Sequence, residues 1–336
     1  IGVVGAIAPW NVPVALALWK VAPALVTGNT VVLKPSPFTP LTTLRICALF
    51  RDHLPAGVLN VVSGGDELGP WMTSHPDIDK ISFTGSTATG KKVMASAAQT
   101  LKRVTLELGG NDAAIVLPGV DIDKVAAKLF QAAFGNSGQI CIATKRIYVH
   151  ADIYEPFMKA MTALGRQAKI GDGTEQGVQF GPIQNQQQYT RVKNLIDDCR
   201  VNKYRFVLGE NNEIPEKGYF VPLTIVDNPP ADARIVREEQ FGPVLPILRF
   251  EDVEAAVALA NDTAYGLGAS VWGPPSQAAD IAVRLEAGTV WVNEIHTMAA
   301  GQPFGGHKQS GIGVENGLGG MLEYTNAQTI VTAKAP

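Results

Sequence analysis

The length, composition and charge of this chain predict a globular protein of two or three domains. It has 336 residues, of which 46% are hydrophobic, enough for a large buried core. The formal net charge is −3 and charged residues make up 18% of the chain, so it has no excess of lysine or arginine to bind a nucleic acid or an acidic membrane surface. We therefore expect no nucleic-acid partner.

Neither the apolar stretches nor the cysteines indicate a membrane or secreted protein. The longest apolar stretches, such as residues 12–18 and 21–26, are far shorter than the roughly 20 residues of a membrane helix. The chain shows no initiator Met, basic region or cleavage site, which predicts no signal peptide and allows a start further upstream. Cys47, Cys141 and Cys199 are odd in number and widely spaced, which is typical of neither a disulfide framework nor a zinc site. We expect a reduced, cytoplasmic protein without a metal.

Residues 1–109 alternate short β-branched runs with amphipathic segments, a pattern typical of a nucleotide-binding domain with a parallel sheet. Each expected helix begins where a polar residue can cap it, and prolines 13 and 40 stand where a missing N–H costs least. The expected strands cover residues 3–8, 30–34, 58–62, 80–84 and 104–108, and the helices begin near residues 11–13, 39–40, 66 and 86.

A pair of glycines, Gly109 and Gly110, separates this part from a second α/β series that we extend to residue 310. The expected strands there cover residues 113–117, 146–150, 247–250, 268–272 and 289–293, and the helices residues 121–134, 252–261 and 276–286. A glycine-rich region over residues 301–320 leads to a last extended run at residues 328–332, within a tail of residues 311–336. The predicted fold class is α/β, with a Rossmann-like nucleotide-binding domain and a second α/β domain that we expect to be catalytic.

Cys141 is the first candidate for chemistry. A lone cysteine most often packs inertly in a core. Here the preceding residues 135–139 are short, polar or glycine, and they let backbone N–H groups approach and present the sulfur. The residues alone leave both interpretations open, a nucleophile and a core cysteine.

Glu107 stands between two leucines at the C-terminal end of an expected strand. A strand carboxylate usually faces solvent, but this one, followed by two glycines, lies at the edge where α/β sheets bind ligands, and it could act as a general base. Asn11 closes the first expected strand within a Pro-Trp-Asn-Val-Pro segment. Its amide could cap the next helix, or it could donate a hydrogen bond to a developing oxyanion, which is worth about 3–4 kcal/mol.

The loop of residues 83–92 follows a strand and opens a helix, so its N–H groups can hold a diphosphate. Its G-x-x-x-x-G-K pattern is complete, but Lys92 stands where a P-loop needs Ser or Thr to ligate magnesium, and no G-x-G-x-x-G is present there. Lys34 ends a strand, well placed for a ribose or phosphate, and Glu239 precedes the ring of Phe241 by two residues. Singly, such residues are more often surface charge.

Taken together, these segments resemble the aldehyde dehydrogenase superfamily from residue 1 to about residue 330. The LELGG segment around Glu107 and the GQIC segment that ends at Cys141 are similar to the family's glutamate and cysteine signatures, and their separation fits the family pattern. Four further segments match in order, namely Pro9-Trp10-Asn11, Phe83-Thr84-Gly85-Ser86-Thr87, Glu239-Gln240-Phe241-Gly242-Pro243 and Pro303-Phe304-Gly305-Gly306.

The resemblance implies roles for individual residues. Cys141 would be the nucleophile, its N–H and Asn11 the oxyanion hole, Glu107 the base that activates water, and Glu315 part of a proton relay. The coenzyme, NAD or NADP with NAD favoured, would be held by Trp10, Lys34, Ser36, Gly85, Ser86, Leu108, Glu239 and Phe241. The substrate pocket, for an uncharged small-molecule aldehyde, would be lined by Val12, Trp19, Ile140, Ile142, Met298 and Phe304. The tail would supply an oligomerisation strand, which implies a homo-dimer or homo-tetramer.

Two departures from the family pattern affect these expectations. Pro37 stands where many NAD-preferring members carry an acidic residue three positions after the lysine, which leaves the choice between NAD and NADP open. Family members also usually carry a long segment before the first strand found here. Without it, apolar tail positions such as Ile330 and Val331 would lose a pairing partner, so we expect this chain to be poorly stable or inactive unless it belongs to a longer polypeptide.

Three alternatives stay open. Glu107 argues against a coenzyme-A-acylating enzyme, whose thioester must be protected from water. A phosphorylating glyceraldehyde-phosphate enzyme needs a histidine near the cysteine, and the five histidines, His53, His75, His150, His296 and His307, all lie outside that segment. The third alternative is a catalytically silent relative that acts as a structural or binding protein; intact Cys141, Glu107 and Asn11 argue against it.

Overall fold

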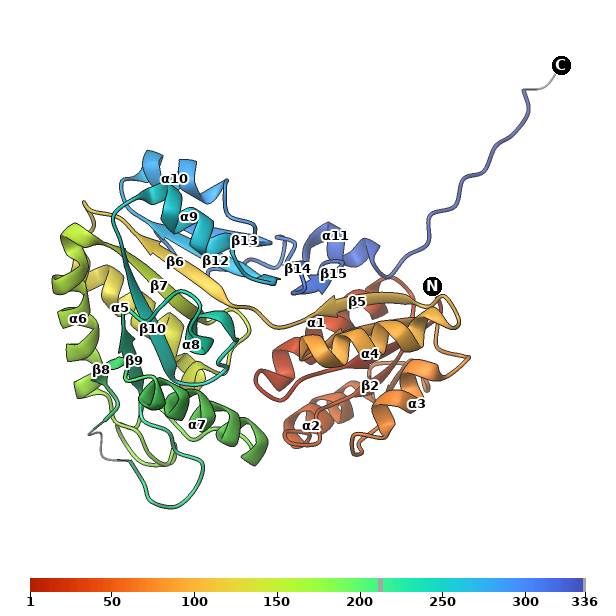
Figure 1. Cartoon of the computed structure of the whole chain (residues 1–336). Coiled ribbons are helices and arrows are strands. Elements are labelled where there is room, and N and C mark those ends of the chain that lie inside the picture. Colours follow the sequence, from red (N-terminus) through yellow and green to blue (C-terminus); the bar gives the residue numbers. More distant parts are fainter. Residues whose placement is uncertain (211–213, 335–336) are drawn as a thin grey trace. The chain divides into compact units, whose positions relative to one another are not determined.

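Backbone contacts in the computed structural model divide the chain into two units, and the structure describes residues 1–210 and 214–334 (Figure 1). Unit 1 comprises Ile1–Glu107, Ala299–Phe304 and Gly313–Pro336, and unit 2 comprises Leu108–Met298 and Gly305–Ile312. The division between Glu107 and Leu108 lies close to the boundary expected after residue 109. The chain after residue 298 returns to unit 1 twice. The expected tail of residues 311–336 therefore begins within unit 2, which extends to Ile312, and continues in unit 1.

Unit 1 contains parallel strands in the order β5-β4-β1-β2-β3. These strands are β1 (Val3–Ile7), β2 (Thr30–Lys34), β3 (Leu59–Val61), β4 (Lys80–Thr84) and β5 (Arg103–Glu107), and the helices are α1 (Pro13–Val26), α2 (Leu41–Phe50), α3 (Leu68–Ser74), α4 (Thr87–Ala98) and α11 (Gly317–Leu322). The chain order reverses between β1 and β4, and in sheets of this type ligands bind outside the carboxyl ends of the strands at such a point.

Unit 2 contains a larger sheet in the order β13-β12-β6-β7-β10-β9-β8, parallel except for β8, which runs antiparallel to β9. The strands are β6 (Asp112–Val116), β7 (Thr144–His150), β8 (Arg205–Leu208), β9 (Thr224–Asp227), β10 (Val244–Phe250), β12 (Gly268–Trp272) and β13 (Thr289–Val292). The helices are α5 (Ile122–Phe134), α6 (Tyr154–Gln167), α7 (Gln186–Val201), α8 (Arg234–Arg237), α9 (Val253–Asn261) and α10 (Pro275–Ala282). Short strands β11 (Tyr265–Gly266) and β14 (His307–Lys308) pair with each other, and β15 (Gly311–Ile312) follows.

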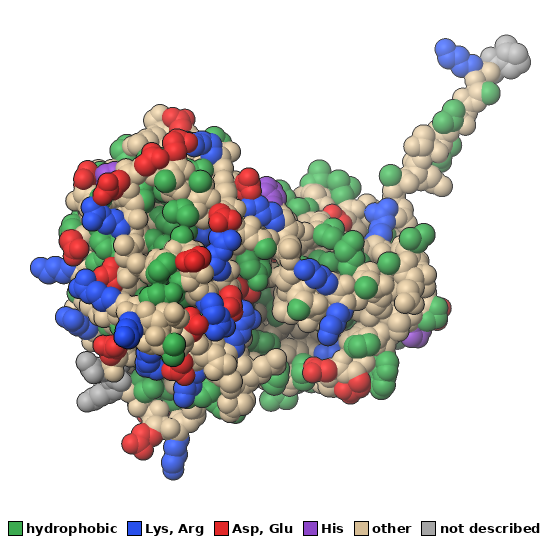
Figure 2. All heavy atoms as spheres, in the orientation of Figure 1, with side chains coloured by type: hydrophobic (Ala, Val, Ile, Leu, Met, Phe, Trp, Pro, Cys, Tyr) green, Lys and Arg blue, Asp and Glu red, His purple; other side chains and the backbone are tan. Residues whose placement is uncertain are grey.

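The core of unit 2 lies on both faces of its sheet, because successive side chains along a strand point to opposite faces. Along β6, Ala113 and Ile115 pack with α7, α9 and α10, whereas Ala114 and Val116 pack with α5 and α6. Helix α5 begins at a true cap, since the Asp121 side chain accepts a hydrogen bond from the Lys124 N–H. Over this unit, Figure 2 shows Lys and Arg side chains interspersed with Asp and Glu.

Most predicted elements have counterparts in the structure. Three strands, Thr30–Lys34, Lys80–Thr84 and Gly268–Trp272, begin and end as predicted. The helix predicted over residues 276–286 ends at Ala282, and Val283, which is 86% exposed, is its C-cap residue. Helices α6 to α8 and strands β8 and β9 were not predicted.

The extended run predicted at residues 328–332 forms neither helix nor strand in this chain. Residues 325–334 have no regular structure, and Ile330 and Val331 are 80% and 87% exposed. A strand needs a neighbour for its N–H and C=O groups, and within the described residues no strand pairs with this run. In the same described part of the chain, every helix is too short or too polar to cross a membrane.

Candidate functional site

The turn that leads into Cys141 has an unusual backbone. Asn136 and Ser137 have φ values of 52° and 54°, and Gly138 has a φ of 72°. Left-handed conformations cost roughly 1–2 kcal/mol for residues other than glycine, so two in succession persist only where the surroundings impose them. At Gly138 a Cβ would lie 2.3 Å from the Gly242 carbonyl oxygen, so only glycine fits. Such backbone strain is typical of functional sites.

Gln139 anchors this turn. Its side chain is buried, its Nε2 donates to the Asn136 carbonyl over 3.0 Å, and its Oε1 accepts from the Gln184 N–H over 2.9 Å. The Ser137 hydroxyl donates to the Gly181 carbonyl over 2.8 Å. The loop is therefore tied to the segment of residues 181–184, which explains how the strained turn is maintained.

Cys141 differs from the other cysteine of unit 2. Cys199 is fully buried in the core, where burial raises the pKa of its thiol to about 11, whereas Cys141 is only half-buried. Cys141 is therefore not enclosed in a core as Cys199 is, and its role as a nucleophile stays a prediction.

Lys145, on β7, holds the cysteine loop through its ammonium and was not singled out from the sequence. Its ammonium donates to the carbonyl oxygens of Ile140 over 2.9 Å, Cys141 over 2.6 Å and Ala143 over 3.3 Å. Its side chain is 3% exposed, and its Nζ lies 3.9 Å from a carboxylate oxygen of Glu239. A lysine within a strand that is otherwise buried was the only signal in the sequence.

Glu239 is buried in unit 2, and a backbone N–H group orients its carboxylate. Its carboxylate accepts from the Gly110 N–H over 2.9 Å, and burial raises its pKa while the positive charge of Lys145 opposes that shift. Two side chains of α7 that the sequence did not indicate hold its loop: Arg191 donates to the Glu239 carbonyl, and Gln188 donates to the carbonyl of Phe241. The predicted coenzyme residues of unit 2 thus lie on a well-supported loop.

A histidine also reaches the cysteine loop. All five histidines lie outside the cysteine segment of the sequence, yet the fold brings His296 Nε2 within 2.7 Å of the Ile142 carbonyl oxygen. Burial lowers the pKa of His296, and a neutral ring donates from Nε2 in this contact. The backbone of His296 is left-handed, with a φ of 59°. Met298, a predicted substrate residue two positions later, is 41% exposed.

In unit 1, the predicted coenzyme residues gather at the carboxyl ends of the strands. Lys34 ends β2 and is 5% exposed, as is Ser36, and burial lowers the pKa of Lys34. Ser86 follows β4 and caps α4, since its hydroxyl accepts from the Thr89 N–H over 3.2 Å. A helix N-terminus at this edge of the sheet is suited to a diphosphate.

The loop after β1 corrects one interpretation of Asn11. The N-cap position of α1 is Val12, so Asn11 is not the N-cap residue. Its other possible role, donation to an oxyanion, stays a prediction. The backbone of Trp10 is anchored by a hydrogen bond, in which its carbonyl oxygen accepts from the Thr39 hydroxyl over 3.3 Å.

Glu107 is the last residue of β5 and is 2% exposed. Strands β4 and β5 pair Thr84 with Glu107, and the Glu107 carbonyl accepts from the Gly85 N–H over 3.1 Å. The fold therefore brings the predicted base and the predicted diphosphate loop to the same edge of the unit 1 sheet. Leu108 begins unit 2, where its N–H donates to the Ser310 carbonyl over 2.9 Å.

Glu315 has a partner that the sequence did not reveal. The Lys20 ammonium of α1 lies 2.6 Å from the Glu315 carboxylate, and both side chains are essentially buried. Lys20 also donates to the Thr84 hydroxyl over 2.7 Å, and the Ser82 hydroxyl lies 3.4 Å from the same carboxylate oxygen. The feature of the sequence that could have indicated a role for Lys20 is its charge within the apolar helix sequence WKVAPAL.

Two of the predicted substrate residues meet within unit 1. The rings of Trp19 and Phe304 pack edge to face with centroids 5.7 Å apart. Phe304 exchanges backbone hydrogen bonds of 2.7 and 2.6 Å with Glu315. Of the others, Val12 precedes α1, and Ile140 and Ile142 flank Cys141 in unit 2.

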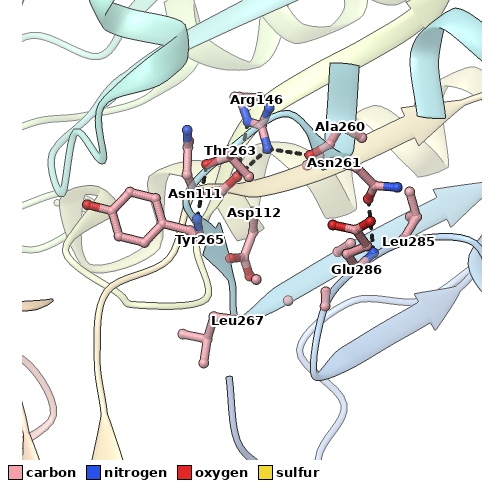
Figure 3. Close-up of a pocket in the computed structure, with 15 residues that line it drawn as sticks. Asn111, Asp112, Arg146, Ala260, Asn261, Thr263, Tyr265, Leu267, Leu285 and Glu286 are labelled. Carbon is pink, nitrogen blue, oxygen red and sulfur yellow. Dashed lines mark hydrogen bonds between the residues drawn. The ribbon is translucent and has the colours of Figure 1, made fainter. Parts of the chain in front are cut away.

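Unit 2 also has a small cavity that holds none of the predicted site residues (Figure 3). Asp112 points into it; this side chain is 4% exposed, and burial raises its pKa to about 7, against the opposing effects of Lys145 and the Gly268 N–H. The Arg146 guanidinium, above Asp112 in the figure, is held by the Asn111 and Ala260 carbonyls. Over residues 1–210 and 214–334, no cluster of His, Cys, Asp and Glu could hold a metal.

The chain is similar to known aldehyde dehydrogenases. The family model described as "Aldehyde dehydrogenase family" matches residues 1–330. The chain is 44% identical over 335 residues to the putative aldehyde dehydrogenase FUS7 of Gibberella moniliformis, covering 99% of this chain and 71% of the relative. It is 42% identical to the phenylacetaldehyde dehydrogenase of Pseudomonas fluorescens, covering 99% and 67%.

Solved structures agree with these relatives. The fold matches an aldehyde dehydrogenase of Mycobacterium tuberculosis complexed with NAD+, with a TM-score of 0.93, 41% identity, and coverage of 97% of this chain and 68% of the other. It also matches the betaine aldehyde dehydrogenase of Staphylococcus aureus in complex with NAD+, with a TM-score of 0.92, 36% identity, and coverage of 96% and 65%.

Proposed function

The chain belongs to the aldehyde dehydrogenase family and is an oxidoreductase that acts on aldehydes; from that premise, we propose how its own residues carry out the oxidation. Cys141 is the nucleophile, the product is a carboxylic acid, and the coenzyme is NAD or NADP. The observation that carries the proposal is the strained, anchored turn before Cys141, which supports a half-buried sulfur presented for reaction.

In the first step the Cys141 sulfur forms a bond to the aldehyde carbon, and the aldehyde oxygen becomes an oxyanion. The Asn11 amide and the Cys141 N–H donate hydrogen bonds to it, and losing one such donor typically costs 10² to 10³ in kcat. When bound, NAD or NADP supplies the two-electron acceptor that converts the thiohemiacetal into a thioester. Glu107 then takes a proton from the water that attacks the thioester, which releases the acid and restores the thiol.

Unit 1 offers residues that fit the coenzyme. Lys34 at the end of β2 suits a ribose hydroxyl, and the capped N-terminus of α4 at Ser86 suits the diphosphate. In unit 2, Glu239 would bind the nicotinamide ribose and Phe241 would lie against the nicotinamide. Trp10, Ser36, Gly85 and Leu108 complete the proposed coenzyme residues. Pro37, in place of an acidic residue, leaves discrimination between NAD and NADP to measurement.

The Glu315–Lys20 pair is proposed to relay the proton that Glu107 collects. Both groups are buried and in direct contact, and the Thr84 and Ser82 hydroxyls extend the hydrogen-bonded chain within unit 1. A carboxylate held by an ammonium and hydroxyls can pass protons without being exposed to solvent. The relay therefore depends on an ion pair, which an amide at position 315 cannot form.

The proposed substrate is an uncharged aldehyde. Val12, Trp19 and Phe304 in unit 1 and Ile140, Ile142 and Met298 in unit 2 are apolar, and apolar linings favour uncharged ligands. We further propose a cytoplasmic homo-dimer or homo-tetramer, with residues 325–334 pairing with another copy, since their backbone is unpaired by any strand of the described chain. Light scattering of the full chain and of a chain ending at residue 324 tests this assembly.

A panel of aliphatic, aromatic and charged aldehydes, assayed with NAD and with NADP at the nicotinamide absorbance, tests the function. Cys141→Ala should abolish turnover, and Glu107→Gln should leave a single burst of reduced coenzyme without steady turnover. Cys47→Ala, a half-buried cysteine of α2, is the matched control and should keep the wild-type rate. A Cys141→Ala variant that keeps its rate would refute the mechanism, and a folded wild type inactive on the whole panel would favour a silent structural relative.

A further inference from the structure

Lys145 is a buried cation with no role in the mechanism above. An ammonium has three N–H donors, and Lys145 has three carbonyl oxygens within 3.3 Å, those of Ile140, Cys141 and Ala143. All three acceptors lie in the loop that carries the nucleophile. The contact with Glu239 at 3.9 Å is therefore one of charge and not of hydrogen bonding.

The ammonium of Lys145 has the Glu239 carboxylate near it and a second acidic group, Asp112, on the neighbouring strand. Glu239 lies 3.9 Å away, and Asp112 begins β6, the strand that pairs with β7. The positive charge of Lys145 lowers the pKa of Asp112 against the larger, opposite effect of burial, so the two groups lie close enough to interact. A buried ammonium without such partners would be destabilised by the loss of its hydration, so the cluster as a whole holds Lys145 in position.

We propose that Lys145 is a positioning residue that links the nucleophile to the coenzyme-binding carboxylate. Its ammonium donates a hydrogen bond to the Cys141 carbonyl and is also paired with the Glu239 carboxylate. It therefore fixes the distance between Cys141 and Glu239 within unit 2. The inference rests on the proposed roles of Cys141 and Glu239. Arginine cannot replace the lysine, because a planar guanidinium does not direct its donors to three carbonyls around one point.

The test compares Lys145→Met with the wild type by two measurements. The first is the rate at which iodoacetamide alkylates Cys141, followed by mass spectrometry of its peptide, which needs neither substrate nor coenzyme. The second is the KM for the coenzyme, measured beside kcat. We expect alkylation and kcat to fall at least tenfold, because the loop loses all three of its ammonium donors.

A mutant cycle with Glu239 separates positioning from general structural damage. Lys145→Met should change the KM for the coenzyme at least threefold in the Glu239 background, and by less than a factor of 1.5 in the Glu239→Gln background. Damage to the fold alone would change KM equally in both. Lys145→Gln, which keeps amide donors, should recover part of the alkylation rate. Lys169→Met, which removes an exposed lysine paired with Glu175, is the matched control and should change neither rate.

Two results would overturn the inference: a folded Lys145→Met with an alkylation rate within twofold of the wild type, or equal KM changes in both Glu239 backgrounds. If the methionine variant does not fold, the same comparisons on Lys145→Gln decide. If the wild type turns over no aldehyde while alkylation still depends on Lys145, the proposed function fails and the positioning of Cys141 stands. If the wild type turns over aldehydes and Lys145→Met matches it, only the inference fails.

Discussion

Replacing Lys20 by methionine should strongly destabilise the protein, because it removes the ammonium that is in direct contact with the buried Glu315 carboxylate. The two groups are 2.6 Å apart with side chains 0% and 2% exposed. At an effective dielectric constant of about 20, their attraction is about 6 kcal/mol, and the desolvation of two ions, at several kcal/mol each, offsets it. The intact pair therefore contributes little net stability, whereas loss of one partner costs about 3–5 kcal/mol.

Urea unfolding followed by circular dichroism and tryptophan fluorescence measures this cost. The double variant Lys20→Met/Glu315→Gln removes both charges and should be at least about 2 kcal/mol more stable than Lys20→Met alone, since the carboxylate is removed together with the ammonium that it contacts. Lys92→Met, at an exposed position of α4, is the control and should change stability by less than about 0.5 kcal/mol. A cost for Lys20→Met below about 1 kcal/mol, or a double variant as unstable as the sum of the single ones, would refute the reasoning.

Three further predictions concern stability. Ser86→Ala should cost about 1 kcal/mol in urea unfolding, because the Thr89 N–H loses its cap; no loss would mean that the cap contributes nothing. Gly138→Ala should destabilise the cysteine loop and slow Cys141 alkylation, since its Cβ would meet the Gly242 carbonyl; an unchanged rate would contradict the assignment of a required left-handed glycine. Asp112 has a pKa raised to about 7 in the folded protein, so the stability from its bound proton is complete below about pH 4 and lost as pH rises to about 7, on the order of 4 kcal/mol. Asp112→Asn should therefore gain stability relative to the wild type between pH 5 and pH 8 in denaturant titrations, and a difference independent of pH would contradict it.

Local patterns in the sequence determined most of the architecture. The strands of unit 1 and strands β6, β7, β10, β12 and β13 were predicted because buried β-branched runs and helix caps are encoded by neighbouring residues. Ser86 caps α4 as predicted, whereas the N-cap positions of α1, α2 and α3 make no side-chain capping bond. Helix α7 was not predicted, because glutamine and charged residues dominate its sequence and its buried residues, such as Leu195 and Cys199, form only a narrow stripe.

The family and the candidates Cys141, Glu107 and Asn11 could also be predicted from the sequence, because their motifs are short and contiguous. The partners of the site residues could not, because they come from distant parts of the chain. Lys20 and Glu315 are 295 residues apart in the chain, and His296 and Ile142 are 154 apart. Such contacts depend on strand order and register, which are set by packing over the whole domain. For that reason no role could be assigned to Lys145 from the sequence, although it follows Cys141 by only four residues. Its role could be inferred only from its carbonyl and carboxylate partners in the folded chain.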